Sequence, residues 1–179
     1  MEIIQSMDFA VLDFIRENFR CAFLDTVMPA VTSLGNGGKF WVLLTVVLLI
    51  IPKTRTVGKV SAVSLLICFL VTNVTIKPLA ARVRPYDINT AVELIVKAPS
   101  DFSFPSGHTS IAFAGASSIF FCNKKAGIPF LVLAAVIGLS RLYLYVHFPT
   151  DVIAGAVIGT AAGYAGYRII AGRSSKRIS

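Results

Sequence analysis

The sequence predicts an all-α protein, a polytopic transmembrane bundle of about six spanning helices preceded by an N-terminal amphipathic helix. Three observations lead to this fold class. Hydrophobic residues make up 55% of the 179 residues and charged residues only 15%, whereas soluble proteins carry about 25% charged residues. The mean hydropathy is +0.76, so a soluble domain of this length would leave too much apolar surface in water. About six spans of about 20 residues each fit this length with short loops.

Residues 3–19 are expected to form a helix in the membrane interface. Apolar side chains fall at helical spacing in this segment, and charged residues such as Asp8 and Arg16 interrupt them. The pattern is typical of an interfacial amphipathic helix, and packing against other helices is the alternative. Six apolar runs follow as expected spans, at 21–34, 39–52, 60–76, 107–122, 127–146 and 151–171. The first two are weak, since Asp25 and Pro29 interrupt the first, and a tilted or partly interfacial helix could replace either.

The basic residues predict the orientation. The net charge is +8, which in a soluble protein would suggest nucleic acid, but membrane proteins collect Lys and Arg in cytoplasmic loops. Loops 53–59 and 123–126 and the C-terminal tail carry basic residues and no acid. We therefore expect no nucleic-acid partner, a cytoplasmic C-terminus, and an extracytoplasmic position for the long loop 77–106. We expect the chain to form a single domain, 1–179, in which the motifs lie within a core of roughly residues 60–171.

Three polar clusters fall at the same expected outer level of the membrane, where ionisable residues are costly and usually functional. Lys77, Arg84 and Arg141 bring three cations together, and guanidinium groups match phosphate oxygens in pairs. Ser106 and Gly107 stand where a loop begins a helix, so free backbone N–H groups face an approaching anion and Gly107 lets it come close. These residues predict a phosphate-binding site.

The two histidines of the chain both belong to these clusters. Asp151 follows His147 by four residues and can reach back to a ring nitrogen, which makes His147 a candidate nucleophile toward phosphorus. His108, on another helix, is suited to protonate the leaving oxygen. No Cys, His and Asp set shows metal-ligand spacing, so we expect a mechanism without metal or cofactor in which Lys and Arg neutralise the charge.

Each cluster also has a simpler interpretation. The histidines can be hydrogen-bonded packing residues, and Lys77, Arg82 and Arg84 can be helix-end side chains that extend to the interface. Arg141 and Asp151 can form a structural ion pair, and Ser106 can be an ordinary helix N-cap. The joint occurrence of all clusters on one side, in the order cation loop, helix-start turn and His–Asp pair, favours the catalytic interpretation.

The motifs and their spacing carry a family resemblance. They are Lys77 and, after six intervening residues, Arg84-Pro85, then Pro105-Ser106-Gly107-His108, then Ser140-Arg141 with His147 and Asp151. In order and spacing they resemble the three motifs of the type 2 phosphatidic acid phosphatase superfamily, which also includes vanadium haloperoxidases and glucose-6-phosphatase. The resemblance covers roughly residues 60–171.

The resemblance implies an integral membrane lipid phosphatase that works through a phosphohistidine. His147 would be the nucleophile, Asp151 would orient it and stabilise its charge, and His108 would be the general acid. Arg82 lies outside the family pattern and is a candidate head-group contact. The residues expected to hold the phosphoryl oxygens are Lys77, Arg84, Ser106, Gly107 and Arg141.

The expected substrate is a lipid phosphate or pyrophosphate, with undecaprenyl pyrophosphate first and phosphatidylglycerophosphate or phosphatidic acid as alternatives, because the motifs recognise phosphate and not the lipid tail. The apolar helices disfavour a soluble haloperoxidase. A non-enzymatic anion or lipid transporter would leave the His–Asp pair without a role. Membrane lipids are the other expected partners, and the sequence leaves the oligomeric state open.

Overall fold

The computed structural model describes residues 2–175 of the chain and the side chains of residues 3–171. Its ordered elements are all helical, and no strand occurs in this range, which confirms the all-α class. The principal helices are α1 (Glu2–Phe19), α2 (Ala22–Ser33), α3 (Lys39–Ile50), α4 (Arg55–Phe69), α7 (Gly107–Cys122), α8 (Lys124–Tyr143) and α9 (Pro149–Ser175). Shorter helical segments are η1 (Asn36–Gly38), η2 (Pro52–Thr54), η3 (Leu70–Ile76), α5 (Lys77–Ala80) and α6 (Pro85–Ile88).

Within the described range, three helical stretches are long and apolar enough to cross a membrane: Pro52–Ile88, Lys124–Tyr143 and Pro149–Ala171. A fourth is obtained if α2 and the stretch that contains α3, which meet at a bend of 42°, are counted as one broken span. The bend lies at a turn where Gly37 and Gly38 both have positive φ, a conformation that glycine adopts without steric cost. By length and composition the fold is that of a multi-pass membrane protein.

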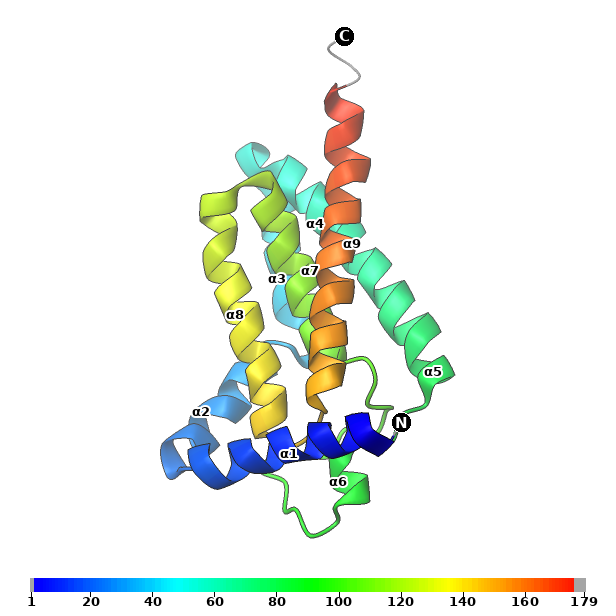
Figure 1. The fold of residues 1–179 in the computed structure, drawn as a ribbon. Coiled ribbons are helices and arrows are strands. Elements are labelled where there is room, and N and C mark those ends of the chain that lie inside the picture. The colour runs from blue at the N-terminus through cyan, green and yellow to red at the C-terminus, as the bar shows by residue number, and fades with distance from the viewer. Residues whose placement is uncertain (1, 176–179) are drawn as a thin grey trace.

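The bundle has two distinct ends (Figure 1). The long helices run roughly side by side, and α1 lies across one end of them, close to α6 and the loop that follows it. The start of α4, the turn between α7 and α8, and the described end of α9 lie at the opposite end. Lys176 and Arg177, expected among the basic residues of that end, lie outside the described residues.

Helix α1 is held to the bundle by one buried face. Leu12 is fully buried in a small cluster with Leu142, Tyr145 and Phe148. The Phe9 ring meets the Phe148 ring edge to face, with centroids 5.2 Å apart. Other apolar side chains of α1 are exposed, and they are Ile3, Ile4, Met7, Val11 and Phe14. The helix therefore has one face for the protein and a second apolar face that the protein leaves uncovered.

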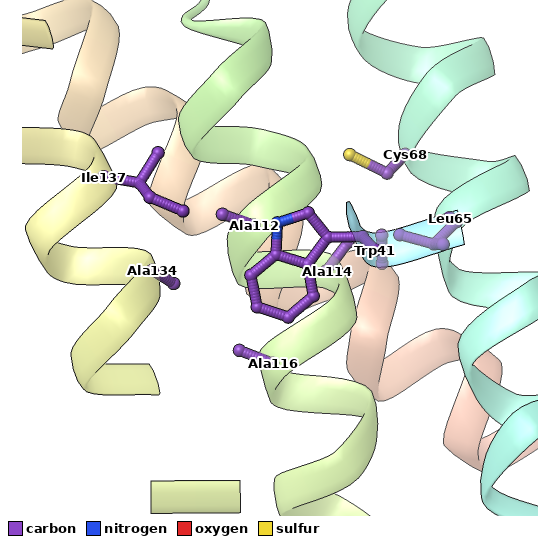
Figure 2. Packing of buried hydrophobic residues seen from close by; sticks show 9 residues of the cluster. Trp41, Leu65, Cys68, Ala112, Ala114, Ala116, Ala134 and Ile137 are labelled. Carbon is purple, nitrogen blue, oxygen red and sulfur yellow. The ribbon is translucent and has the colours of Figure 1, made fainter. Parts of the chain in front are cut away.

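Helix α7 forms the centre of the bundle and is built from small residues. Figure 2 shows the indole of Trp41, from α3, lying against the alanines of α7, with Ala134 and Ile137 of α8 beyond. Trp41 is 1% exposed, and a Cβ atom at Gly115 would collide with its ring. The serine hydroxyls of α7 form hydrogen bonds within their own helix. For example, the Ser118 hydroxyl donates to the Gly115 carbonyl at 2.7 Å. Small side chains thus let α7 approach its neighbours closely.

A row of glycines on α9 brings its backbone against α7. A Cβ atom at Gly155 would lie 2.8 Å from the Ser106 carbonyl oxygen, and one at Gly159 would overlap the Ser110 carbonyl and lie 2.9 Å from the Ala114 nitrogen. The contacted atoms are backbone, which cannot move aside without shifting a helix. Close approach through small residues is the usual way in which membrane helices pack, because lipid provides no hydrophobic drive for association.

We expect Gly159→Leu to destabilise the fold by about 2 kcal/mol or more, since the added side chain must push α7 and α9 apart. The measurement is the thermal unfolding midpoint of the purified protein in detergent. Ala161→Leu is the matched control, because Ala161 is exposed on the same helix. Equal midpoints for the two variants would contradict the close packing of α7 and α9.

Candidate active site

A cavity of about 230 Å³ opens at the end of the bundle where α1 lies. Six of the eight residues predicted for the site line it, and they are Lys77, Arg84, Gly107, His108, Arg141 and His147. The other two, Ser106 and Asp151, are fully buried directly behind it. Residues separated by 70 positions in the chain are therefore brought to one place by the fold.

The local backbone explains how the first cluster reaches the cavity. The end of the fourth helix widens into the π-helical segment η3, and such segments occur often at functional sites. Lys77 follows directly and is 6% exposed. Ala81 then adopts a left-handed conformation with φ of 43°, which ends α5 and turns the chain back so that Arg84 also faces the cavity. A non-glycine residue in this conformation is strained, as is common beside functional sites.

The cations of the cavity hold a carboxylate. Lys77 Nζ donates to Asp101 Oδ2, and Arg84 Nη2 donates to Asp101 Oδ1 at 2.5 Å. Partial burial acts to raise the pKa of Asp101, but the hydrogen bonds and charges of Lys77 and Arg84 outweigh it and lower this pKa to about 2. The side chain of Asp101 stays 55% exposed. An ionised, solvent-accessible carboxylate thus occupies the place where the sequence predicts an anion.

Arg141 approaches the cavity from the last turn of α8. It is 3% exposed, and its Nη1 donates to the Thr32 hydroxyl at 2.6 Å. Its Nε is buried without a hydrogen-bond partner among the described residues. Arg141 does not form a structural ion pair with Asp151, which was the simpler interpretation. Asp151 pairs with Arg82 instead.

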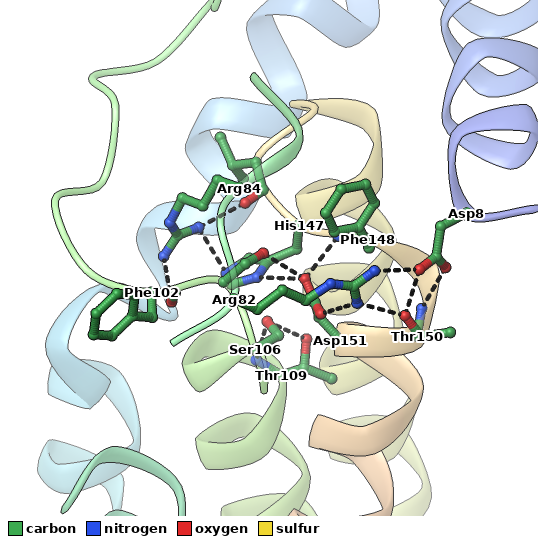
Figure 3. Close-up of polar contacts among 12 residues, drawn as sticks. Asp8, Arg82, Arg84, Phe102, Ser106, Thr109, His147, Phe148, Thr150 and Asp151 are labelled. Carbon is green, nitrogen blue, oxygen red and sulfur yellow. Dashed lines mark hydrogen bonds and ion pairs between the residues drawn. The ribbon is translucent and has the colours of Figure 1, made fainter. Parts of the chain in front are cut away.

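The His147 ring lies between Arg84 and Asp151 (Figure 3). Its Nε2 is 3.2 Å from Arg84 Nη1, and its Nδ1 is 3.5 Å from Asp151 Oδ2 without forming a hydrogen bond. Because a guanidinium can only donate, Nε2 is the unprotonated nitrogen and Nδ1–H faces the carboxylate. Burial, with the charges of Arg84 and Arg141, lowers the pKa of His147 to about 3, although Asp151 acts to raise it. The imidazole is therefore neutral near pH 7, and the Nε2 lone pair accepts from Arg84, which lines the same cavity.

Asp151 is fixed by several donors. Arg82 Nη1 donates to its Oδ1 at 2.6 Å, and the Ser103 hydroxyl and the Phe148 amide donate to its Oδ2 at 2.5 and 2.9 Å. The second amino group of Arg82 donates to Asp8 Oδ2 on α1 at 2.7 Å. Arg82, expected at the lipid head group, thus has its guanidinium between two carboxylates and over the Phe148 ring.

Sequence reasoning missed the part that Asp8 plays. Asp8 is 2% exposed and accepts from the Thr150 amide at 3.0 Å, the Thr150 hydroxyl at 2.6 Å, and Arg82. The spacing of Asp8 in the sequence could have indicated its burial. Asp8 precedes the buried Leu12 by one helical turn, so the two side chains lie on the same face of α1. The N-terminal helix therefore contacts the shell of residues around the His–Asp pair.

The start of α7 supplies backbone donors. Ser106 is the N-cap of the helix, and its hydroxyl accepts from the Thr109 amide at 3.4 Å and the Thr109 hydroxyl at 2.9 Å. Both are contacts that Ser106 accepts, so its own proton can still be donated. A Cβ atom at Gly107 would lie 3.4 Å from Asn73 Oδ1 and 3.8 Å from Lys77 Nζ. The absence of a side chain at Gly107 thus leaves space between the N-terminus of α7 and Lys77.

His108 is positioned by the turn between α2 and α3. Its Nε2 lies 2.8 Å from Asn36 Oδ1, and a Cβ atom at Gly35 would meet its ring at 2.5 Å. The sequence indicated neither Asn36 nor Asn73, since neither belongs to a recognisable motif. Among the described residues, no group of three His, Cys, Asp or Glu side chains is arranged to hold a metal ion.

Comparison with known proteins places this site in a family. The chain is 34% identical over 121 residues to an undecaprenyl-diphosphatase of Sulfolobus acidocaldarius, an alignment that covers 67% of this chain and 58% of that protein. It is 30% identical over 149 residues to the undecaprenyl-diphosphatase BcrC of Bacillus subtilis, covering 81% of this chain and 74% of that one. The aligned part thus spans somewhat more than half of the archaeal relative.

A solved structure shares the fold. It is the first transmembrane PAP2 type phosphatidylglycerolphosphate phosphatase from Bacillus subtilis, with a TM-score of 0.76 and 27% sequence identity, covering 98% of this chain and 88% of that one. The family model described as the PAP2 superfamily matches residues 58–175, a range that contains all three motifs. The chain belongs to the PAP2 superfamily.

Proposed function

We propose that this protein is an integral membrane lipid phosphatase that removes a terminal phosphate from a lipid phosphate or pyrophosphate through a phosphohistidine intermediate. The observation that carries the proposal is the ionised Asp101 carboxylate held by Lys77 and Arg84. Arg84 also lies 3.2 Å from the free Nε2 of His147. A phosphate that replaced the carboxylate would therefore sit beside a neutral imidazole lone pair.

The reaction needs two steps. In the first, His147 Nε2 attacks phosphorus, the bond to the leaving lipid oxygen breaks, and His108 gives that oxygen a proton. The positive charge that develops on the His147 ring is stabilised by Asp151 on the Nδ1 side. In the second step water attacks phosphorus and gives its proton to His108, the bond from phosphorus to His147 Nε2 breaks, and inorganic phosphate leaves. The groups that hold the phosphoryl oxygens are Lys77, Arg84, Arg141, the Ser106 hydroxyl and the Gly107 backbone.

Undecaprenyl pyrophosphate is the favoured substrate, since the two relatives described above carry that activity in their names. Phosphatidylglycerophosphate and phosphatidic acid are the alternatives, and the similarity to a phosphatidylglycerolphosphate phosphatase supports the first of these. A transporter is less well supported. Anion binding alone would not explain a buried His147 whose lone pair faces the same cavity as the cations.

The proposed membrane arrangement makes the whole chain a single domain with five crossings. Four follow from the apolar stretches if the bent pair is one broken span. The fifth is α7, because its 16 residues connect the site end of the bundle to the turn at Asn123 where α8 begins. This is one crossing fewer than the count of about six expected from the sequence, because α2 has only 12 residues. We further propose that α1 lies in the interface, with its exposed apolar face toward lipid.

The proposed site faces the outside of the cell. The opposite end of the bundle carries Lys53, Arg55 and Lys59 near the start of α4, and Lys124 and Lys125 at the start of α8. Basic loops of this kind remain in the cytoplasm. A lipid carrier whose phosphate faces outward would then reach the cavity directly.

The proposed activity is tested by phosphate release from undecaprenyl pyrophosphate, phosphatidylglycerophosphate and phosphatidic acid in detergent micelles. We expect the pyrophosphate to be cleaved with the highest kcat/KM, at the same rate with and without EDTA. We expect His147→Ala to lose at least about 10³-fold in kcat, because the nucleophile is gone. Release from none of the three lipids by the unmodified protein would disprove the phosphatase assignment.

The orientation is tested by topology reporters fused at residue 90 and residue 125. We expect residue 90 to report the extracytoplasmic side and residue 125 the cytoplasmic side, because the basic turn stays inside. Both fusions should be checked for expression in the membrane fraction. The reversed result would place the site in the cytoplasm.

Asp101→Asn is expected to strengthen inhibition by inorganic phosphate about tenfold, because the anion no longer has to displace an ionised carboxylate from Lys77 and Arg84. Since the pKa of Asp101 is about 2, the carboxylate stays charged and the difference between the two proteins should hold from about pH 5 to about pH 8. Asp87→Asn, at an exposed position of the same loop, is the matched control. Weaker inhibition of the Asp101 variant would mean that this carboxylate assists anion binding.

A further inference from the structure

A second cavity, of about 340 Å³, adjoins the first. It is lined by the end of α2, by the turn that carries Asn36, and by residues 96–100 of the loop after α6. Three residues, Pro99, His108 and Arg141, line both cavities. The second cavity is therefore reached past the residue expected to be the general acid.

The lining of the second cavity suits an anion. It contains Lys97 and Arg141 as cations and the Thr32 and Ser100 hydroxyls, and none of the described residues that line it is acidic. The first cavity differs, because its Lys77 and Arg84 are paired with Asp101. No ion pair among the described side chains involves Lys97.

Arg141 lines both cavities. Its side chain is fixed by the hydrogen bond from Nη1 to Thr32, a residue of the second cavity. Its Nε is buried and has no partner among the described residues, and an unpaired charged donor is costly to bury. An anion at the boundary between the cavities would give this nitrogen an acceptor.

His108 stands at the same boundary, and its Nε2 lies 2.8 Å from the side-chain oxygen of Asn36. Asn36 lines the second cavity and not the first. If Asn36 accepts this bond, the Nε2 proton of His108 is directed toward the second cavity. A leaving oxygen that replaced Asn36 as the acceptor of this proton would lie at the boundary, with the rest of the leaving group in the second cavity.

We propose that the second cavity is the subsite for the leaving phosphate of a lipid diphosphate, with Lys97 and Arg141 as its cations. This inference rests on the proposed phosphatase function and deepens it. His147 attacks the terminal phosphorus in the first cavity, the bond from that phosphorus to the bridging oxygen breaks, and the bridging oxygen takes the His108 proton. The product in the second cavity is a lipid monophosphate. In a monoester the same place would hold an uncharged carbon chain, for which Lys97 offers no attraction.

The test compares kcat/KM for a short polyprenyl diphosphate and for the corresponding polyprenyl monophosphate. We expect Lys97→Ala to lower the ratio of the two values about tenfold and Lys97→Glu to lower it further, because a charge-assisted contact to the second phosphate is lost and then reversed. Lys124→Ala, at the opposite end of the bundle, is the matched control and should keep the ratio of the unmodified protein.

An inhibition measurement distinguishes the loss of this subsite from a general weakening of anion binding when Lys97 loses its charge. Methylenediphosphonate carries two phosphonates that cannot be hydrolysed apart, and inorganic phosphate carries one group. We expect Lys97→Ala to weaken inhibition by methylenediphosphonate about tenfold, with a much smaller change for phosphate. Equal weakening for both inhibitors would contradict a subsite that is specific for the second phosphate.

The outcomes distinguish the two proposals. If the unmodified protein releases phosphate from neither polyprenyl substrate, the phosphatase function fails and the subsite fails with it. If the protein cleaves the diphosphate but both Lys97 variants keep the ratio of the unmodified protein, the function stands and the subsite is disproved. If only monophosphates are cleaved, the enzyme is a monoester phosphatase and the second cavity does not hold a leaving phosphate.

Discussion

The structure depends on one buried carboxylate. Asp151 has no exposed surface, and an ionised group in such a place is stable only when its oxygens receive hydrogen bonds and its charge is balanced. The donors come from separate parts of the chain: Arg82, Ser103 and the Phe148 amide. Satisfying this single charge therefore draws together the long loop, the connection between α8 and α9, and the start of α9. In the proposed mechanism the same carboxylate balances the charge that forms on His147.

The same requirement explains why α1 lies where it does. Arg82 donates to Asp151 through Nη1 and to Asp8 through Nη2, so one part-buried guanidinium links the two carboxylates. Asp8 also receives the amide and hydroxyl of Thr150 in the first turn of α9. The N-terminal helix is thus held across the end of the bundle by polar contacts at one residue and by the apolar contacts of Leu12.

The sequence alone predicted the all-α fold class, and six of the eight residues that it nominated for the site line one cavity. They could be nominated because ionisable groups in so apolar a chain stand out by type and spacing. The expected run 107–122 coincides with α7, and 3–19 lies within α1. The roles of Asp101 and Asn36 could not be predicted, since they arise from tertiary contacts between segments far apart in the chain. Asp8 was missed although its helical spacing from Leu12 places it on the buried face of α1. The expected run 21–34 forms α2, and the chain bends after it near Gly37 and Gly38, so that α2 and the stretch with α3 qualify together as one broken span.

The close contact between α7 and α9 has a consequence for how such a protein can diversify. Gly155 lies against the carbonyl of the buried Ser106. Main-chain atoms of α9 and of the start of α7 therefore meet behind the cavity that both histidines line. Residues 96–98 of the loop line the second cavity and not the first, and substitutions there leave the contact between the two helices unaltered. In the proposed mechanism the reacting groups and residues 96–98 are therefore separate parts of the molecule, so that variation at these three positions can alter lipid preference while the helix contact behind the reacting groups is kept.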